Sequence, residues 1–129
     1  MNRTVIATGD APAAVGPYSQ AIRMGQFVFT AGQAAIDPAI GGLIDGDVAA
    51  QTEQVMRNLQ AILVAAGSDM EHIVKTTVFL KNMDHFAAMN EVYGSYFPED
   101  PPARSTVEAA RLPLGALVEI EAIAVIVDD

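Results

Sequence analysis

The residues with the clearest chemical potential lie late in the chain, in the segment PPARSTVEAARLPLGALVEIEAIA at 101–124. Arg104 follows two prolines, and Glu119 and Glu121 interrupt a run that is otherwise almost wholly apolar. A guanidinium presents a planar fork that matches a carboxylate through two hydrogen bonds. A glutamate can orient a water molecule or relay a proton. The functional interpretation is therefore an anion clamp with carboxylates nearby in sequence.

These three residues also have a structural interpretation. An arginine at the start of a strand is often a surface side chain that pairs with a glutamate. Side chains two apart in a strand point to the same face, so Glu119 and Glu121 share one face, which can be simply solvated. The alternate positions from Val118 to Ile126 are uniformly apolar and belong to the core. Residue types alone leave both interpretations open.

Two further candidates for a site lie earlier in the chain. Asn90 stands among aromatic and methionine side chains at helical spacing, where a buried amide needs hydrogen-bond partners. It can bind a ligand, or it can simply bond a backbone carbonyl. Tyr18, in the loop sequence GPYSQA, is compatible with a pocket residue or with plain packing.

Composition and charge exclude several kinds of site. The chain contains no cysteine, which removes disulfides, thiolate metal sites and cysteine nucleophiles. His72 and His85 lack the spacing of a zinc or iron site, no glycine-rich phosphate loop precedes a helix, and residues 41–47 fit a calcium loop poorly. We therefore expect no metal and no cofactor.

Charge and hydropathy also limit the partners. Sixteen acidic residues against seven lysines and arginines give a formal net charge of −9, so nucleic acid is a poor partner. The N-terminal residues contain no long apolar stretch, and no window of 18 residues is apolar enough to span a membrane. We expect one cytoplasmic domain over residues 1–129, without membrane contact.

The first half of the chain is predicted to form a hairpin and a helix, which must help to position the candidate site residues. Residues 21–33 predict a hairpin that turns near Met24-Gly25, and residues 36–47 predict a loop rich in glycine and aspartate. Asp47 is suited to cap a helix that Gly67 ends. One face of that helix is apolar apart from a threonine: Val48, Thr52, Val55, Leu59, Ile62 and Ala66.

The second half alternates strand and helix. Residues 72–80 predict a β-branched strand, and Asp84 is suited to cap a second helix that Pro98 ends. A stripe of that helix carries Phe86, Met89, Asn90, Tyr93 and Phe97. Two closing strands follow, joined by a short Leu-Pro-Leu-Gly turn. The order β-β-α-β-α-β-β predicts an α+β fold with both helices on one face of the sheet, so the other face needs cover from further subunits.

The closing segment resembles the C-terminal signature of the Rid/YjgF family, the reactive-intermediate deaminases. The resemblance rests on PPARSTVEAARLP followed by VEIEAIA, and it continues over most of the chain in the family's order. The further segments are APAAVGPYSQA (11–21), FTAGQ (29–33), QTEQVMRNLQAIL (51–63), IVKTTVFL (73–80) and MNEVYGSYFPEDPPARS (89–105).

The resemblance implies a chorismate-mutase-like α+β fold with a mixed sheet, assembled as a homotrimer with sites between subunits. It implies hydrolysis of short 2-imino and 2-enamino acids to 2-oxo acids and ammonia, without metal or cofactor. The substrates would be 2-aminoacrylate, with its tautomer 2-iminopropanoate, and 2-iminobutanoate. By the same resemblance Arg104 binds the substrate carboxylate, Glu119 positions water, and Tyr18, Gly32 and Asn90 line the pocket.

Two positions depart from the family pattern. Ala31 stands where many members carry a serine, and Thr106 occupies a pocket position where many carry a cysteine. Both changes bear on substrate preference and rate more than on the class of reaction. Three alternatives remain open: a trimer that binds 2-oxo acids without turnover, a ribonuclease or translation inhibitor, and a chaperone-like protein.

Overall fold

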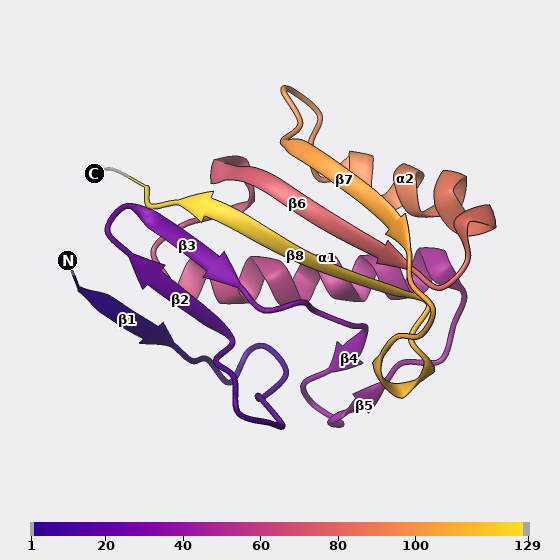
Figure 1. Cartoon of the computed structure of the whole chain (residues 1–129), viewed down its shortest axis with the longest axis horizontal. Coiled ribbons are helices and arrows are strands. Elements are labelled where there is room, and N and C mark those ends of the chain that lie inside the picture. Colours follow the sequence, from indigo (N-terminus) through magenta and orange to yellow (C-terminus); the bar gives the residue numbers. More distant parts are fainter. Residues whose placement is uncertain (1, 128–129) are drawn as a thin grey trace.

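A six-stranded mixed sheet forms the centre of the computed structural model, which describes residues 2–127 (Figure 1). Its strand order is β1-β2-β3-β8-β6-β7. Neighbouring strands are antiparallel except β6 and β7, which run parallel. The strands are β1 (Arg3–Ile6), β2 (Ala21–Met24), β3 (Phe27–Thr30), β6 (Ile73–Leu80), β7 (Ala103–Glu108) and β8 (Val118–Val125). The predicted α+β class with a mixed sheet is confirmed.

The longer helix, α1 (Val48–Ala65), begins and ends as its sequence predicts. The Asp47 carboxylate accepts a hydrogen bond of 2.9 Å from the Ala50 N–H, which satisfies one of the free donors of the first turn. Gly67, with φ of +88°, lies just after the last turn in the left-handed region that glycine adopts without strain. All six residues of the predicted helix face are buried, so this face packs on the sheet.

The shorter helix, α2 (Phe86–Ser95), starts later and ends earlier than its sequence predicts. The prediction that Asp84 caps it is wrong: Asn82 accepts a hydrogen bond of 2.8 Å from the Asp84 N–H and starts a single 3-10 turn, Met83–His85, before the helix. The helix stops at Ser95, before Pro98 is reached. Phe86 is also 38% exposed, so the predicted stripe is buried only further along the helix.

Three short strands were not predicted. β1 carries three exposed residues and only one buried residue, so its sequence shows no apolar alternation. Residues 36–47 are mostly loop, as expected, but β4 (Ile36–Asp37) and β5 (Gly42–Leu43) pair within them. The predicted hairpin is confirmed as β2 and β3, and Gly25 adopts a φ of +61° at its turn.

The two closing strands are joined by a turn but do not pair with each other. β6 lies between β7 and β8, because β7 runs parallel to β6 on one side and β8 runs antiparallel on the other. The connection contains a 3-10 turn, Pro113–Gly115, in which Leu114 has a positive φ of 60°. The acidic strand β8 therefore occupies a central place in the sheet, while the arginine strand β7 lies at its edge.

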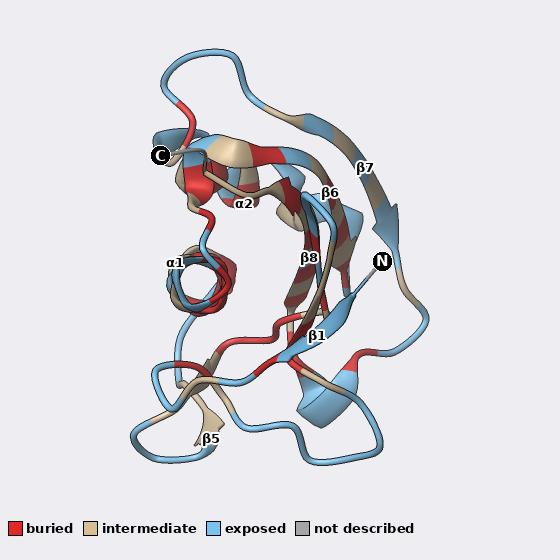
Figure 2. Cartoon of the chain, turned by 90° about the vertical axis from the view of Figure 1, so that its left-hand side faces the viewer, coloured by how far each residue is buried: buried red, intermediate tan, exposed pale blue. Residues whose placement is uncertain are grey.

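The two faces of the sheet differ in cover. Figure 2 shows α1 and α2 on one side of the sheet, and no element of residues 2–127 packs on the other. Along β8 the buried residues alternate with less buried ones, as predicted, and the buried set faces the helices. On the opposite face, the outer face, Phe27, Phe29 and Val107 are each exposed by more than 40% in the single chain. This apolar surface is the one expected to need cover.

Candidate functional site

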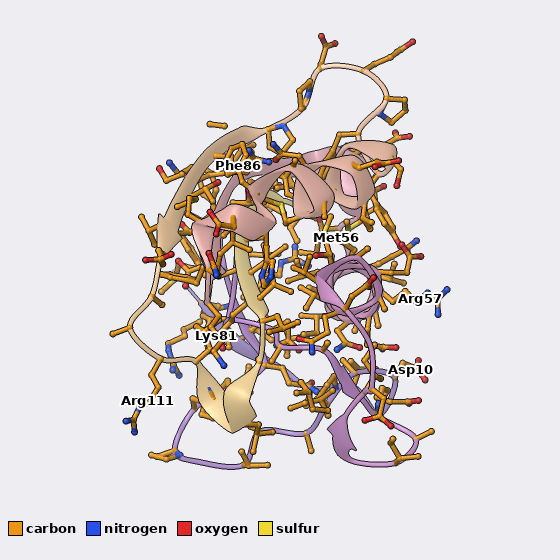
Figure 3. All side chains as sticks on the ribbon, turned by 90° about the vertical axis from the view of Figure 1, so that its right-hand side faces the viewer. Asp10, Met56, Arg57, Lys81, Phe86 and Arg111 are labelled. Atoms are coloured by element: carbon orange, nitrogen blue, oxygen red, sulfur yellow. The ribbon has the colours of Figure 1, made fainter. Side chains whose placement is uncertain are left out.

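Arg104 lies on β7 and points toward α2. The β6–β7 register aligns it with Thr76, a buried residue of the helix-facing side, so the arginine faces the same way. Its Cζ atom is 4.8 Å from the centre of the Tyr93 ring and 5.4 Å from that of Phe86. Figure 3 labels Phe86, at the end of α2 that lies against β7. A guanidinium at these distances from two ring faces gains cation–π attraction.

Tyr93 is fixed by a hydrogen bond as well as by packing. Its hydroxyl lies 2.7 Å from Oγ1 of Thr76, and its ring is tilted against the Phe97 ring at a centroid distance of 4.9 Å. Burial raises the pKa of Tyr93 above its ordinary value, although the bond to Thr76 and the charge of Arg104 act the other way. The phenol is therefore neutral at physiological pH, and its ring presents an uncharged aromatic face to the arginine.

A cleft of about 410 Å³ opens beside Arg104. Its walls come from α2, from the following proline segment and from β7: Asn90, Tyr93, Gly94, Phe97, Pro101, Pro102 and Arg104. The Oδ1 atom of Asn90 is buried and has no hydrogen-bond partner within residues 2–127. A buried amide oxygen without a partner is an available acceptor for a ligand N–H. The structure thus brings two predicted residues, Arg104 and Asn90, to one cleft.

Thr106 lies on the same face of β7 as Arg104, two residues further along the strand. It is half-buried and aligned with Val78 of β6. It is not among the residues that line the cleft. Its hydroxyl can reach a ligand only where that ligand extends along β7 from Arg104.

Glu119 lies on the opposite face of the sheet. It aligns with Phe79 of β6, which is three residues from Thr76 and therefore points to the other side. Gly32 lies directly against it: a Cβ atom at Gly32 would come within 2.7 Å of Oε1 of Glu119. Desolvation by burial raises the pKa of Glu119 above its ordinary value, and the charge of nearby Glu121 adds to the effect. This carboxylate is a stronger base than an exposed one.

Tyr18 lies in the loop between β1 and β2, two residues before Gln20. The Ala31 N–H donates to the Gln20 carbonyl at 2.9 Å, which places the Tyr18 segment beside the Gly32 segment. The buried Gln20 side chain holds this loop through bonds to Thr8, Ala11 and Pro12. Tyr18 itself is 51% exposed and does not line the Arg104 cleft.

All the predicted site residues except Thr106 therefore fall into two groups. We call Arg104 and Asn90, together with Tyr93, which was not predicted as a site residue, the arginine group. We call Glu119 with Gly32, beside the Tyr18 loop, the glutamate group. The strand register places the two groups on opposite faces of the sheet, so one chain cannot bring Arg104 and Glu119 to the same ligand.

Three residues that contact or support Arg104 were not predicted as site residues. Phe86 and Tyr93 were expected as members of an apolar helix stripe, although their spacing of seven residues already places both rings on one helical face. Thr76 carried no signal, because nothing in a β-branched strand marks one threonine among its neighbours.

Within residues 2–127, no group of three or more His, Cys, Asp or Glu side chains is placed to hold a metal ion. Among the helices of the same residues, none combines the length and the apolar character that crossing a membrane requires.

The family assignment follows from the sequence as a whole. Residues 8–126 match the family model described as Endoribonuclease L-PSP. The chain belongs to this family. It is the Rid/YjgF family that the C-terminal signature indicates.

Members of this family with different names resemble the chain over nearly its full length. A RutC family protein of Pyrococcus horikoshii is 54% identical over 122 residues, covering 95% of this chain and 97% of the relative. The 2-iminobutanoate/2-iminopropanoate deaminase of Mus musculus is 48% identical over 123 residues, covering 95% and 91%. The crystal structure of E. coli TdcF with bound serine superimposes with a TM-score of 0.90 at 43% identity, covering 95% and 98%.

Proposed function

We propose that this Rid/YjgF member hydrolyses short 2-imino and 2-enamino acids to 2-oxo acids and ammonia. The observation that carries the proposal is the arginine group: a guanidinium held over two aromatic rings at the wall of a cleft, beside the free amide oxygen of Asn90. A guanidinium binds a carboxylate, and an amide oxygen accepts from an imine or enamine N–H. The name of the mouse relative and the serine bound to TdcF support a substrate derived from an amino acid.

The chemistry needs little beyond orientation and proton transfer. Arg104 holds the substrate carboxylate and so fixes the neighbouring C=N carbon. Glu119 accepts a proton from a water molecule, whose oxygen adds to that carbon, and passes this proton to the nitrogen, giving a carbinolamine. The hydroxyl proton of the carbinolamine is then transferred to its amino nitrogen, the C–N bond breaks, and ammonia leaves as the C=O bond forms. Orientation and one positioned base together account for a large acceleration of such a step.

This proposal includes a homotrimer whose sites lie between subunits. Because Arg104 and Glu119 lie on opposite faces of the sheet, a complete site requires the arginine group of one chain and the glutamate group of another. The exposed apolar surface around Phe27, Phe29 and Val107 supports such an assembly, since it would be buried there. A closed ring of three chains would repeat the same heterologous contact three times.

A trimer that binds 2-oxo acids without turnover is the second candidate, because the arginine group would bind a 2-oxo acid equally well. The family description also names a ribonuclease. The net charge of −9 opposes binding to a polyanion, so we place this activity third.

The test is a coupled assay in which a threonine dehydratase generates 2-iminobutanoate in the presence of the protein. We expect the wild-type protein to accelerate the formation of 2-oxobutanoate and ammonia, and Arg104→Ala to lose most of this acceleration. Arg57→Ala is the matched control, since Arg57 lies exposed on the outer side of α1 (Figure 3). Binding of 2-oxobutanoate without acceleration would favour the regulatory trimer instead.

A further inference from the structure

Resting on the proposed function, we infer that Tyr93 and Thr76 are positioning residues for Arg104. The hydroxyl pair that joins them sets the plane of the Tyr93 ring, and this ring in turn holds the guanidinium in the geometry that receives a carboxylate. Neither residue is required to touch the substrate for this role.

The contacts form a closed circuit through three elements. Thr76 on β6 is aligned with Arg104 on β7 through the strand register, so the two backbones are held together. The Thr76 side chain, in a residue only 1% exposed, is bonded to the Tyr93 hydroxyl on α2. The Tyr93 ring then returns to Arg104 at 4.8 Å. The threonine that aligns the arginine backbone is thus the same residue that fixes the support of its guanidinium.

The circuit matters because the guanidinium of Arg104 is held by its contacts with two aromatic rings. Among the described residues, no carboxylate lies within ion-pair distance of its guanidinium. An ion pair would fix the side chain but would also occupy N–H donors that a ligand needs. Aromatic faces hold the cation through its charge and occupy no donor, so the fork stays free for a carboxylate. The position of the Tyr93 ring therefore determines the position of the guanidinium that binds the anion.

The hydroxyl and the ring of Tyr93 can be separated experimentally. Tyr93→Phe and Thr76→Val each remove the hydroxyl pair, while the ring keeps its contact with Phe97. Tyr93→Leu removes the aromatic face itself. If the ring positions Arg104, the first two variants should raise KM about three- to tenfold with a smaller change in kcat. The double variant should be no worse than either single one, because both remove the same bond. Tyr93→Leu should lose at least about tenfold in kcat/KM.

Tyr96→Phe is the matched control. Tyr96 also ends in a hydroxyl bonded at 2.7 Å, but to Glu53 of α1, and it does not line the Arg104 cleft. Removing this hydroxyl perturbs the same end of α2 without touching the circuit, so KM should stay at the wild-type value. A loss of stability alone would affect Tyr93→Phe and Tyr96→Phe alike, and thermal unfolding of both variants measures it.

A second readout does not depend on turnover. A group held over an aromatic face is shifted upfield in the proton NMR spectrum, so the Arg104 Nε–H resonance, identified by its absence in Arg104→Ala, should move downfield in Tyr93→Leu and stay in place in Tyr96→Phe. Unchanged KM in Tyr93→Phe and Thr76→Val, with an unmoved Arg104 resonance in Tyr93→Leu, would overturn the inference. Full turnover by Arg104→Ala would instead contradict the proposed function, whatever the resonance shows.

Discussion

At the residue scale, Arg104 shows why the type of cation matters. Its guanidinium is planar and lies over two rings, and a planar cation can contact the ring faces while its edge binds a carboxylate. A lysine ammonium is a point charge that lacks the fork. The site therefore depends on the shape of the cation as well as on its charge.

Arg104→Lys should consequently fail nearly as badly as Arg104→Ala. We expect a loss on the order of 2–5 kcal/mol of transition-state stabilisation, as for truncation of a buried, hydrogen-bonded charge pair. The measurement is kcat/KM in the dehydratase-coupled assay for both variants. Most of the wild-type activity in the lysine variant would mean that a point charge suffices.

Glu119 is distinguished from Glu121 by its surroundings. Both side chains point to the outer face, but Glu119 is half-buried against Gly32, whereas Glu121 is exposed. Burial raises the pKa of Glu119, so its proton is lost at a higher pH than in the unfolded chain. Such a group favours folding below its unfolded pKa, and this contribution is lost as the pH rises through its folded pKa.

Glu119→Gln should therefore lose activity without losing stability. Turnover should fall roughly 10²–10⁴-fold, the range for a positioned acid–base group, while binding of 2-oxobutanoate survives. At neutral pH the thermal midpoint should equal or exceed that of the wild-type protein, because a partly desolvated charge is removed. In the wild-type protein kcat should decline as the pH falls through the raised pKa of Glu119, and this acidic limb should be absent from the residual activity of the variant.

Glu121→Gln is the comparison for this prediction. It removes an exposed charge on the same strand face, so turnover should change much less. A larger loss in Glu121→Gln than in Glu119→Gln would reverse the assignment of the base. Wild-type turnover in both variants would mean that water addition needs no carboxylate.

At the element scale, the turn after β3 positions Glu119. Gln33 and Ile120 exchange backbone hydrogen bonds of 2.8 and 3.1 Å, which hold the turn against the start of β8. Gly32 then faces the Glu119 side chain so closely that a methyl group would meet its Oε1, Cδ and Cγ atoms at 2.7, 2.9 and 3.1 Å. The backbone of Gly32 does not adopt the left-handed conformation that favours glycine. The glycine therefore matters for the room it leaves to the Glu119 carboxylate.

Gly32→Ala should therefore displace the carboxylate and leave the fold intact. The added methyl group meets the end of a flexible side chain, so the thermal midpoint should change little. A displacement of about 1 Å can cost on the order of 10²-fold in rate, and we expect a loss of that order in kcat. Gly42→Ala is the control, because a Cβ atom there meets nothing within 4 Å. Equal kcat for the two variants would contradict a positioning role for this turn.

At the scale of the whole molecule, the sheet separates the two groups of the site. The helices cover one face (Figure 2), and the strand register places exposed phenylalanines and Glu119 on the other. A trimer would bury the apolar surface and bring the glutamate group of one chain to the arginine group of the next. In the proposed function, only the assembled trimer therefore contains a complete active site.

Mixing two inactive variants tests this directly. Arg104→Ala and Glu119→Gln, unfolded together and refolded at equal amounts, should recover about a quarter of the wild-type activity, because random assembly pairs two intact groups at about a quarter of the sites. The mass in solution should be three times 13.6 kDa. Each variant refolded alone is the control. No recovery in a mixed trimer, or a 13.6 kDa species alone at micromolar concentration, would contradict the shared site.

Much of the fold could be predicted from local sequence, because its signals act over short distances. Capping by Asp47 needs only the next three residues, and the alternation along Val118–Val125 needs only the pleat of one strand. The residues of the proposed chemistry could be named in the same way, since Arg104 and Glu119 stand in one recognisable segment.

Tertiary structure alone decided how these residues are combined. The sequence carries no local signal that β6 separates β7 from β8, because strand pairing depends on contacts between distant segments. That pairing turns Arg104 and Glu119, close in sequence, to opposite faces of the sheet. It also brings Thr76 and Tyr93 to Arg104 from two other elements, through an alignment and a side-chain contact that no spacing along the chain could reveal.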